Sequence, residues 1–582
     1  MKVLKFGGTS VGSAENIRRV KAIVQNQSNN IIVVVSALGG ITDSILGAAT
    51  RAATGTGDFH TELTQIRERH EAVMEELFIG AGEVKQHVDR LHNELEQILT
   101  GITLVGELTP KTLDRIAGIG ERISSHIIAR YLNAERKDAS EFIQTNSNFG
   151  RAGVNFDFTD KSISETFQSF SGIAVVPGFI AKNSKGEFTT LGRGGSDYTA
   201  AIIAAALEVE VLEIWTDVNG FMTADPRVIR KAYTIPQLTY AEAMELSHFG
   251  AKVIYPPTIL PVYKKGIPIQ INNTFNPDDT GTRILKGVQT RKDRPIKGIS
   301  SISGITLLTL QGIGMVGVTG ISMRLFSALA LVNINVILIS QASSENSISV
   351  AIDERDVEKA DAAIRMEFEK EINNGQINKI DAESDLSIVA IVGENMKHTT
   401  GIAGKLFSTI GKNGINIVAI AQGASELNIS WVVKTGELRK TLNVVHESFF
   451  LSENIELNIF LMGIGTVGKS LLEQLQKQQE KLLSEKHLKL KLTGVANTKK
   501  MLFDRDGIGI SSFKERLDNS ETASSLAGFA DEMRAMNIYN SVFVDCTASE
   551  DVALLYKEIL NSNISVVTAN KVAASSDFEN YT

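Results

Sequence analysis

The sequence predicts an α/β protein built from three successive domains, and three features of the chain support this prediction. Short apolar strands in the first half run into glycine-rich turns that open helices, as at residues 1–10 and 191–205. The middle of the chain holds two copies of one pattern, whose matched segments begin at residues 335 and 416, 81 positions apart. A further glycine-rich turn, at residues 463–468, follows a new apolar strand. A chain of 582 residues is too long for a single hydrophobic core.

The first glycine-rich turn has the chemistry of a phosphate site. Lys5 lies on an apolar strand that leads into Gly7 and Gly8, and Thr9 and Ser10 follow. Adjacent glycines let backbone N–H groups approach an anion, the lysine supplies a positive charge and the hydroxyls add donors. The order differs from that of a P-loop, because the lysine precedes the glycines. Taken alone, Lys-Phe-Gly-Gly is explained equally well as an ordinary turn between a strand and a helix.

The second glycine-rich turn, Gly-Arg-Gly-Gly-Ser-Asp at residues 192–197, is more specific. Arg193 suits bidentate binding of a carboxylate or phosphate, and Asp197 suits the ordering of a magnesium nucleotide. A purely structural turn does not require both residues. Glu121, in the first turn of a helix, is by itself explained as a partner of the helix dipole.

The end of the strand near residue 216 is a further candidate site. Strand ends followed by polar loops are where α/β sheets bind nucleotides, and Asp217 lies in such a loop. The Asp225-Pro226-Arg227 turn follows a few residues later, and turn formation alone explains an Asp-Pro pair as well.

Seven motifs in this order resemble those of the aspartate kinases of the amino-acid kinase superfamily. They are Lys-Phe-Gly-Gly-Thr-Ser, Val-Val-Ser-Ala (34–37), Gly-Glu-Arg (120–122), Gly-Arg-Gly-Gly-Ser-Asp, Thr-Asp-Val-Asn-Gly, Ala-Asp-Pro-Arg and Gly-Ala-Lys-Val-Ile-Tyr-Pro (250–256). The resemblance implies the αβα sandwich of that superfamily over residues 1–288. It also implies transfer of the γ-phosphoryl group of ATP to the side-chain carboxylate of aspartate.

The same resemblance implies roles for individual residues. Lys5 would stabilise the transferring phosphoryl group, Arg193 and Glu121 would bind the carboxylate and ammonium of aspartate, and Asp197 would order the substrate and phosphate ends. The other implied contacts are Thr42 and Ser196 to aspartate, and Gly7, Gly8, Thr9, Ser10, Ser36, Thr216, Asp217, Asp225, Arg227 and Lys252 to ATP. The acceptor carboxylate is ionised at neutral pH, so the reaction needs positioning and charge neutralisation and no general base. Mg²⁺ is expected with ATP, although the sequence shows no dedicated protein cage for it.

The central repeat predicts a duplicated domain of ferredoxin-like βαββαβ order. It resembles the paired ACT domains that follow the kinase in regulated aspartate kinases, here over residues 296–447. Gln341 and Gln422 end equivalent strands of the two copies, and a side-chain amide there can donate to and accept from an amino acid. Either glutamine alone is explained as well by a role in lining the turn. The identical placement favours effector contact, and the resemblance implies threonine as effector and a homo-oligomer, dimer or tetramer, formed through these domains.

Residues 457–472 read as a buried strand, a G-x-G-x-x-G turn and a helix, the context that a dinucleotide fingerprint requires. Gly463 would make the turn, Gly465 would admit the pyrophosphate and Gly468 would allow close packing of the helix. Thr466 and Val467 belong to the same expected cofactor site. The next strand ends in Asn497-Thr-Lys-Lys, and basic residues there, among them Lys499, favour NADP(H) over NAD.

Two later strands, at residues 542–546 and 564–568, complete a pattern that resembles the nucleotide-binding half of homoserine dehydrogenase, a partial Rossmann domain over residues 455–582. Thr568 and Lys571 are then expected to approach the cofactor. The three domains in this order resemble the bifunctional aspartate kinase/homoserine dehydrogenase family. The chain stops at Thr582, where the substrate region of the dehydrogenase is expected to begin. Homoserine oxidation is therefore expected only of a longer form.

Composition narrows the function further. A net charge of −8 argues against a nucleic-acid partner. The single cysteine, Cys546, excludes an intrachain disulfide, and no leader or membrane segment is apparent, so we expect a cytoplasmic enzyme without a membrane partner.

Two other functions fit part of the sequence: a superfamily kinase with another acceptor, and an amino-acid sensor without catalysis. The Gly-Arg-Gly-Gly-Ser-Asp and ACT-like segments argue against the first, and the complete set of site residues argues against the second.

Overall fold

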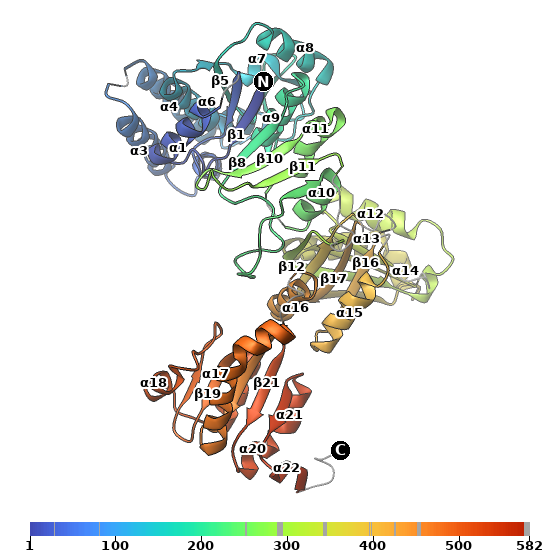
Figure 1. Ribbon diagram of the computed structural model, residues 1–582. Helices are drawn as coiled ribbons and strands as arrows, with labels where there is room; N and C mark the ends of the chain where they lie inside the picture. The colour runs from blue at the N-terminus through green and yellow to red at the C-terminus, as the bar shows by residue number, and fades with distance from the viewer. Residues whose placement is uncertain are drawn as a thin grey trace. The chain divides into compact units, whose positions relative to one another are not determined.

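The computed structural model describes residues 1–582 except 28–29, 81, 251–252, 288–294, 342–345, 395, 397–398, 424–426, 451–454 and 576–582. Contacts divide the chain into two compact units. The first unit contains Met1–Thr223 and Ala232–Arg291, and the second contains Ala224–Lys231 and Lys292–Thr582. Both units are built from layers of helices and sheets (Figure 1).

The first unit is organised around one mixed sheet. Its strands lie in the order β3 (Glu135–Arg136), β5 (Ile173–Pro177), β2 (Ile31–Val35), β1 (Lys2–Phe6), β8 (Leu212–Thr216), β10 (Ile269–Asn273), β11 (Thr282–Leu285) and β9 (Gln237–Thr239). The central strands are parallel, and β2 is buried along its whole length. Parallel strands covered on both faces need such continuous apolar runs, which is why Ile-Ile-Val-Val-Val forms the middle of the sheet. A small side sheet pairs β4 (Gln144–Thr145), β6 (Ile180–Asn183) and β7 (Phe188–Thr190).

Helices cover both faces of this sheet, so the expected αβα sandwich is confirmed (Figure 1). Leu4 and Phe6 of β1 share a buried core with the helices α1 (Ala14–Gln25), α2 (Ile41–Thr54), α3 (His60–Leu77), α4 (Gly82–Val105) and α6 (Ile119–Leu132). The opposite face of β1 contacts α9 (Gly195–Ala206), which packs against α8 (Phe156–Phe167) and α11 (Ile259–Lys265). The remaining helices of the unit are α5 (Pro110–Ala117), α7 (Ala139–Phe142) and α10 (Tyr240–His248). Because side chains alternate along a strand, Lys5 faces α9.

The duplicated pattern forms one antiparallel sheet in the second unit. Its order is β13 (Leu338–Gln341), β14 (Ser347–Asp353), β12 (Gly298–Gln311), β15 (Lys379–Val392), β17 (Asn428–Lys434) and β16 (Ala419–Gln422). The helices α12 (Ile321–Leu331), α13 (Val357–Glu367) and α14 (Glu369–Asn373) belong to the first copy, and α15 (Ile402–Lys412) and α16 (Leu438–Phe450) belong to the second. Equivalent elements begin 81 residues apart, as in α12 and α15 or β14 and β17, so the repeat is confirmed.

The second copy borrows a strand segment from outside its own sequence, which the sequence did not predict. Residues 305–311 of β12 pair with β14 and with residues 379–386 of β15, and these strands complete the first copy. Residues 386–392 of β15 pair with β17 and with residues 298–305 of β12, which complete the second copy. The second copy therefore takes its outer strand from the segment that precedes the first copy.

The last part of the second unit is a mostly parallel sheet. Its order is β20 (Met501–Phe503), β19 (Leu488–Ala496), β18 (Ile455–Met462), β21 (Ser541–Asp545) and β22 (Ser565–Thr568). Helix α17 (Thr466–Lys486) packs on one face, and α19 (Leu526–Met536) and α21 (Tyr556–Asn561) pack on the other. Short helices α18 (Phe513–Asp518), α20 (Glu550–Leu554) and α22 (Val572–Ser575) lie in the connections. No helix among the described residues is long and apolar enough to span a bilayer.

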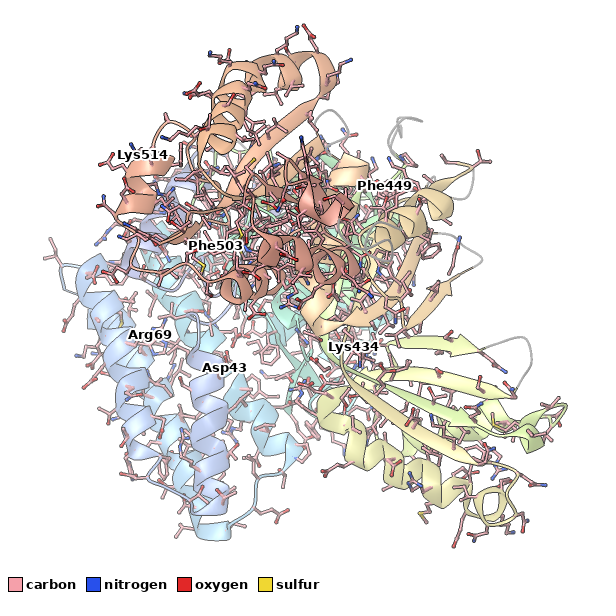
Figure 2. The ribbon with its side chains drawn as sticks, turned by 90° about the horizontal axis from the view of Figure 1, so that it is seen from below. Asp43, Arg69, Lys434, Phe449, Phe503 and Lys514 are labelled. Carbon is pink, nitrogen blue, oxygen red and sulfur yellow. The ribbon has the colours of Figure 1, made fainter. Side chains whose placement is uncertain are left out.

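Two histidines are buried between α3 and α4 of the first unit. His70 and His92 are 0% and 1% exposed, and Nε2 of His92 lies 3.2 Å from Nδ1 of His70. Burial lowers the pKa of His70 to about 3 and that of His92 to about 4. Figure 2 marks the surrounding helices by Asp43 on α2 and Arg69 on α3.

We predict that this pair makes the first unit sensitive to acid. Below about pH 6.5 the unfolded chain binds protons at both histidines while the folded chain does not, so the free energy of unfolding falls as the pH falls. His70→Phe should reduce this loss when urea unfolding is compared at about pH 7.5 and about pH 5. His60→Gln, which changes an exposed histidine of the same helix, should leave the pH dependence of the wild type unchanged. Equal pH dependence in all three proteins would contradict the prediction.

Candidate functional site

The carboxyl ends of neighbouring parallel strands bring distant segments to one edge of the first sheet. Ser36 follows β2, Gly7 follows β1 and Asp217 follows β8. The turns are joined by hydrogen bonds, because the N–H of Gly7 donates to Trp215 O at 3.3 Å and the N–H of Gly39 donates to Gly8 O at 2.9 Å. This edge is where open α/β sheets bind their ligands.

Lys5 contacts the second glycine-rich turn on the face of the sheet that α9 covers. Its Nζ lies 2.5 Å from Asp197 Oδ1, and Asp197 belongs to the first turn of α9. The helix begins after Gly194, which has φ of +72° and approaches Tyr255 so closely that a Cβ would lie 2.5 Å from the tyrosine Cβ. Both the backbone angle and this approach require glycine at that position.

A cavity of about 510 Å³ opens above the ion pair. Its wall collects Lys5, Ser36, Thr42, Glu121, Arg193, Ser196 and Asp197, which the sequence analysis had assigned to aspartate or phosphate. Glu121 is 4% exposed, and burial raises its pKa to about 7. Its Oε2 has no hydrogen-bond partner among the described residues. An unpartnered buried carboxyl oxygen costs stability and fits a cationic group of a ligand.

Some of the residues expected to bind ATP do not line this cavity. Ser10 is completely buried, and its hydroxyl bonds with Thr274 Oγ1 at 2.7 Å and donates to Trp215 O at 3.3 Å. This contradicts its expected role as a hydroxyl donor to phosphate, whereas Thr9 beside it is exposed. Asp225 and Arg227 form an ion pair of 2.8 Å with each other in the segment grouped with the second unit. Lys252 lies outside the described residues.

The cavity wall also contains residues that the sequence analysis missed. Asp43, Asp114, Gly150, Phe179 and Thr190 all line it. Asp114 lies on α5 and Glu121 on the next helix, α6, so helical spacing in the sequence did not reveal that both line one cavity. Asp43 lies in the first turn of α2, and the other three come from loops and a strand end whose placement depends on the fold.

A second cavity, of about 460 Å³, lies in the first copy of the repeat. Gln341 lines it together with Gly320, Ile321, Met323 and Ile348. Gln422 ends β16 of the second copy and is exposed. Residues 395, 397–398 and 424–426 of the second copy lie outside the described ones.

The fingerprint turn lies at the carboxyl end of the second unit's parallel sheet. Gly463 follows β18, Gly465 caps α17, and Thr466 and Val467 form the first helical turn. A Cβ on Gly468 would lie 2.0 Å from Gly463 O, so only glycine lets the helix pack this closely.

The ends of β19 and β22 lie at the same edge of that sheet, because both strands run parallel to their neighbours. Lys499 is exposed in the turn after β19, and Lys571 is exposed after β22. Thr568 Oγ1 lies 2.6 Å from the Tyr556 hydroxyl, which donates to Asp545 Oδ2 at 2.5 Å. The sequence analysis missed Tyr556 and Asp545. Among the described residues no group of three or more His, Cys, Asp or Glu is arranged to hold a metal ion.

Profiles of three known families match the chain in order. Residues 1–273 match the amino acid kinase family, and residues 308–368 and 389–449 match the ACT domain. Residues 463–582 match the NAD-binding domain of homoserine dehydrogenase.

Solved structures share the kinase and ACT architecture. E. coli aspartokinase III in complex with aspartate and ADP is 28% identical, covers 77% of this chain and 100% of its own, and has a TM-score of 0.66. The same enzyme in complex with lysine and aspartate is 29% identical, with a TM-score of 0.64 over 77% of this chain and 99% of its own.

Relatives with both catalytic names match all of the chain. The chloroplastic bifunctional aspartokinase/homoserine dehydrogenase 1 of Arabidopsis thaliana is 36% identical over 100% of this chain, which spans 65% of the length of that relative. The bifunctional aspartokinase/homoserine dehydrogenase of Haemophilus influenzae is 34% identical over 100% of this chain and 72% of its own length. With the kinase, ACT and dinucleotide parts in the same order, the chain belongs to the bifunctional aspartokinase/homoserine dehydrogenase family.

Proposed function

We propose that this chain transfers the γ-phosphoryl group of ATP to the side-chain carboxylate of aspartate. The observation that carries the proposal is the cavity wall, which joins Lys5, Glu121, Arg193 and Asp197 from four separate segments. A substrate with two carboxylates and one ammonium needs cationic contacts and an acid, and this wall offers Lys5 and Arg193 as cations and the unpartnered carboxyl of Glu121 as the acid. The aspartate complexes of the related aspartokinase III support the same substrate.

In this proposal each side chain has one task. Arg193 grips a carboxylate of aspartate, Glu121 pairs with the ammonium, and Thr42 and Ser196 complete the contacts. Lys5 offsets the charge that develops on the transferring phosphoryl group, and Asp197 holds Lys5 in place through their ion pair.

The turns beside the cavity supply the nucleotide contacts. Gly7, Gly8, Thr9, Ser36, Thr216 and Asp217 share the sheet edge, and the backbone N–H groups of the glycine turn suit phosphate. Asp225, Arg227 and Lys252 are assigned to ATP by family resemblance. Mg²⁺ would arrive with ATP and screen its phosphate charge.

A coupled assay of ADP release with a panel of amino acids tests the reaction. Aspartate-dependent release supports the kinase. Release with another carboxylate acceptor would assign the chain to a different kinase of the superfamily, and no release with any acceptor would favour the amino-acid sensor.

The repeat and the fingerprint turn have further proposed functions. Gln341 and Gln422 would contact an amino-acid effector, which we propose to be threonine, and Gln341 lines a cavity large enough for one. The last domain would bind NADP(H), since Lys499 supplies a cation near the expected position of the ribose 2′-phosphate. A homo-oligomer formed through the ACT domains and a cytoplasmic location stay predictions.

Lys5→Ala should lower kcat by roughly 10²- to 10³-fold, the scale of losing one strong electrostatic donor. Lys2→Ala is the matched control, because Lys2 lies on the same strand but bonds Gln27 Oε1 and Glu213 Oε1, both at 3.0 Å. The assay is ADP release at saturating aspartate and ATP, with thermal unfolding to verify folding. Wild-type turnover in a folded Lys5→Ala protein would remove Lys5 from the phosphoryl site.

The affinity for aspartate should depend on the protonation of Glu121. Its pKa of about 7 means that the carboxyl is neutral at lower pH and attracts the ammonium only after it loses its proton. The KM for aspartate should therefore rise about tenfold for each pH unit below 7, while the KM for ATP serves as the internal control. Glu121→Gln should show a high KM for aspartate at every pH. A pH-independent KM in the wild type would argue against the ammonium contact.

Gln341→Ala and Gln422→Ala should each weaken inhibition by threonine and leave uninhibited turnover unchanged, because the effector and substrate sites are distinct. Gln311→Ala, an exposed glutamine at the end of β12, is the matched control. Inhibition curves of the kinase reaction at increasing threonine measure the effect. Curves identical to wild type in both variants would exclude the two glutamines as effector contacts.

A further inference from the structure

Asp114 is a buried acid in the wall of the kinase cavity that the proposed reaction does not use. It lies on α5, it is 3% exposed, and four hydrogen bonds reach its carboxylate. The N–H of Gly150 lies 3.0 Å from Oδ1 and 2.9 Å from Oδ2. The N–H of Thr190 donates to Oδ2 at 3.1 Å, and the Thr190 hydroxyl donates to Oδ1 at 2.7 Å.

These donors explain why the position holds a carboxylate. They come from the turn at Gly150 and from the end of β7, and all are neutral, so the contact is not an ion pair. A carboxylate is acceptor-only, with both oxygens available, whereas an amide side chain would turn an N–H₂ group toward one set of donors. Hydrogen bonds to an ionised acceptor are about twice as strong as neutral ones, so Asp114 holds the two segments firmly together.

Arg193 lies in the turn that follows β7. Thr190 is the last residue of β7, and Arg193 follows three positions later. Between them Gly192, with φ of +73°, lies against the turn at Gly150, since a Cβ there would be 3.3 Å from Gly150 O. The N–H of Gly195 then donates to Gly192 O at 3.0 Å and leads into α9. Asp114 therefore bonds the residue before the turn that presents Arg193, Thr190, and also Gly150, whose carbonyl lies against Gly192 within that turn.

We propose that Asp114 is a positioning residue that holds the Arg193 turn in the geometry for binding the substrate carboxylate. The inference rests on the proposed aspartate kinase function for its kinetic consequence, although the hold on the turn does not depend on the substrate. Misplacement by about 1 Å can lower rates by about 10²-fold, so a loosened turn is expected to weaken aspartate binding measurably.

Asp114→Asn tests the proposal with a side chain of the same shape. The KM for aspartate should rise roughly tenfold to a hundredfold, while the KM for ATP stays within about twofold of wild type. Hydrogen–deuterium exchange of the peptide that spans residues 191–197 should become faster in the same variant. Thr190→Val removes only the hydroxyl donor and should produce a smaller change in the same direction, which keeps the test informative if Asp114→Asn folds poorly.

Asp138→Asn is the matched control. Asp138 also accepts from a backbone N–H and a hydroxyl, those of Ser140 at 3.0 and 2.8 Å, and it pairs with Arg136 at 3.0 Å, but it caps α7 and does not line the cavity. Asp138→Asn should lower the melting temperature, but it should not raise the KM for aspartate relative to the KM for ATP. A parallel rise of both KM values in Asp114→Asn, or unchanged exchange of residues 191–197, would overturn the proposal. If the wild type releases no ADP with aspartate, the proposed function fails, and the exchange experiment still decides whether Asp114 holds the turn.

Discussion

The ion pair between Lys5 and Asp197 is the contact around which the kinase site is arranged. It joins the first strand of the chain to the first turn of α9, so the glycine turn after β1 and the glycine turn before α9 face the same cavity. Removing either partner would leave a charge of low exposure without its counter-ion, which is costly in a protein interior. Glu121, Arg193 and the buried carboxylate of Asp114 line the same cavity as this pair.

Much of this site could be predicted because several of its polar residues belong to short motifs of consecutive residues. Lys5, Arg193 and Asp197 belong to glycine-rich segments whose composition is unusual for simple turns, and the structure brings all three into one cavity. The repeat was equally visible, since matching residues such as Gly320 and Gly401 stand 81 positions apart, and in the structure these two glycines, with φ of +90° and +87°, begin equivalent helices. The dinucleotide turn was predictable for the same reason, because strand, glycines and helix are consecutive in the chain.

What the sequence did not predict depends on contacts between distant segments. The donors to Asp114 come from segments 36 and 76 residues further along the chain, and no local pattern announces them. The neighbours of Ser10 in the sequence suggested that its hydroxyl donates to phosphate. In the structure that hydroxyl is buried and bonds with Thr274, which follows a different strand. The network of Asp545, Tyr556 and Thr568 in the last domain is hidden in the same way, because its members come from two strands and a helix.

The strand that the second ACT copy takes from the segment before the first copy limits how this region can be divided. The family profiles match residues 308–368 and 389–449 as separate domains, yet each match leaves out part of the strands that complete its sheet. A cut in the intervening stretch would strip the first copy of residues 379–386 and would leave an unpaired, apolar sheet edge. Such edges recruit other chains and promote aggregation. The second copy cannot be isolated from residue 389 onward, because its outer strand, residues 298–305, precedes the first copy in the chain.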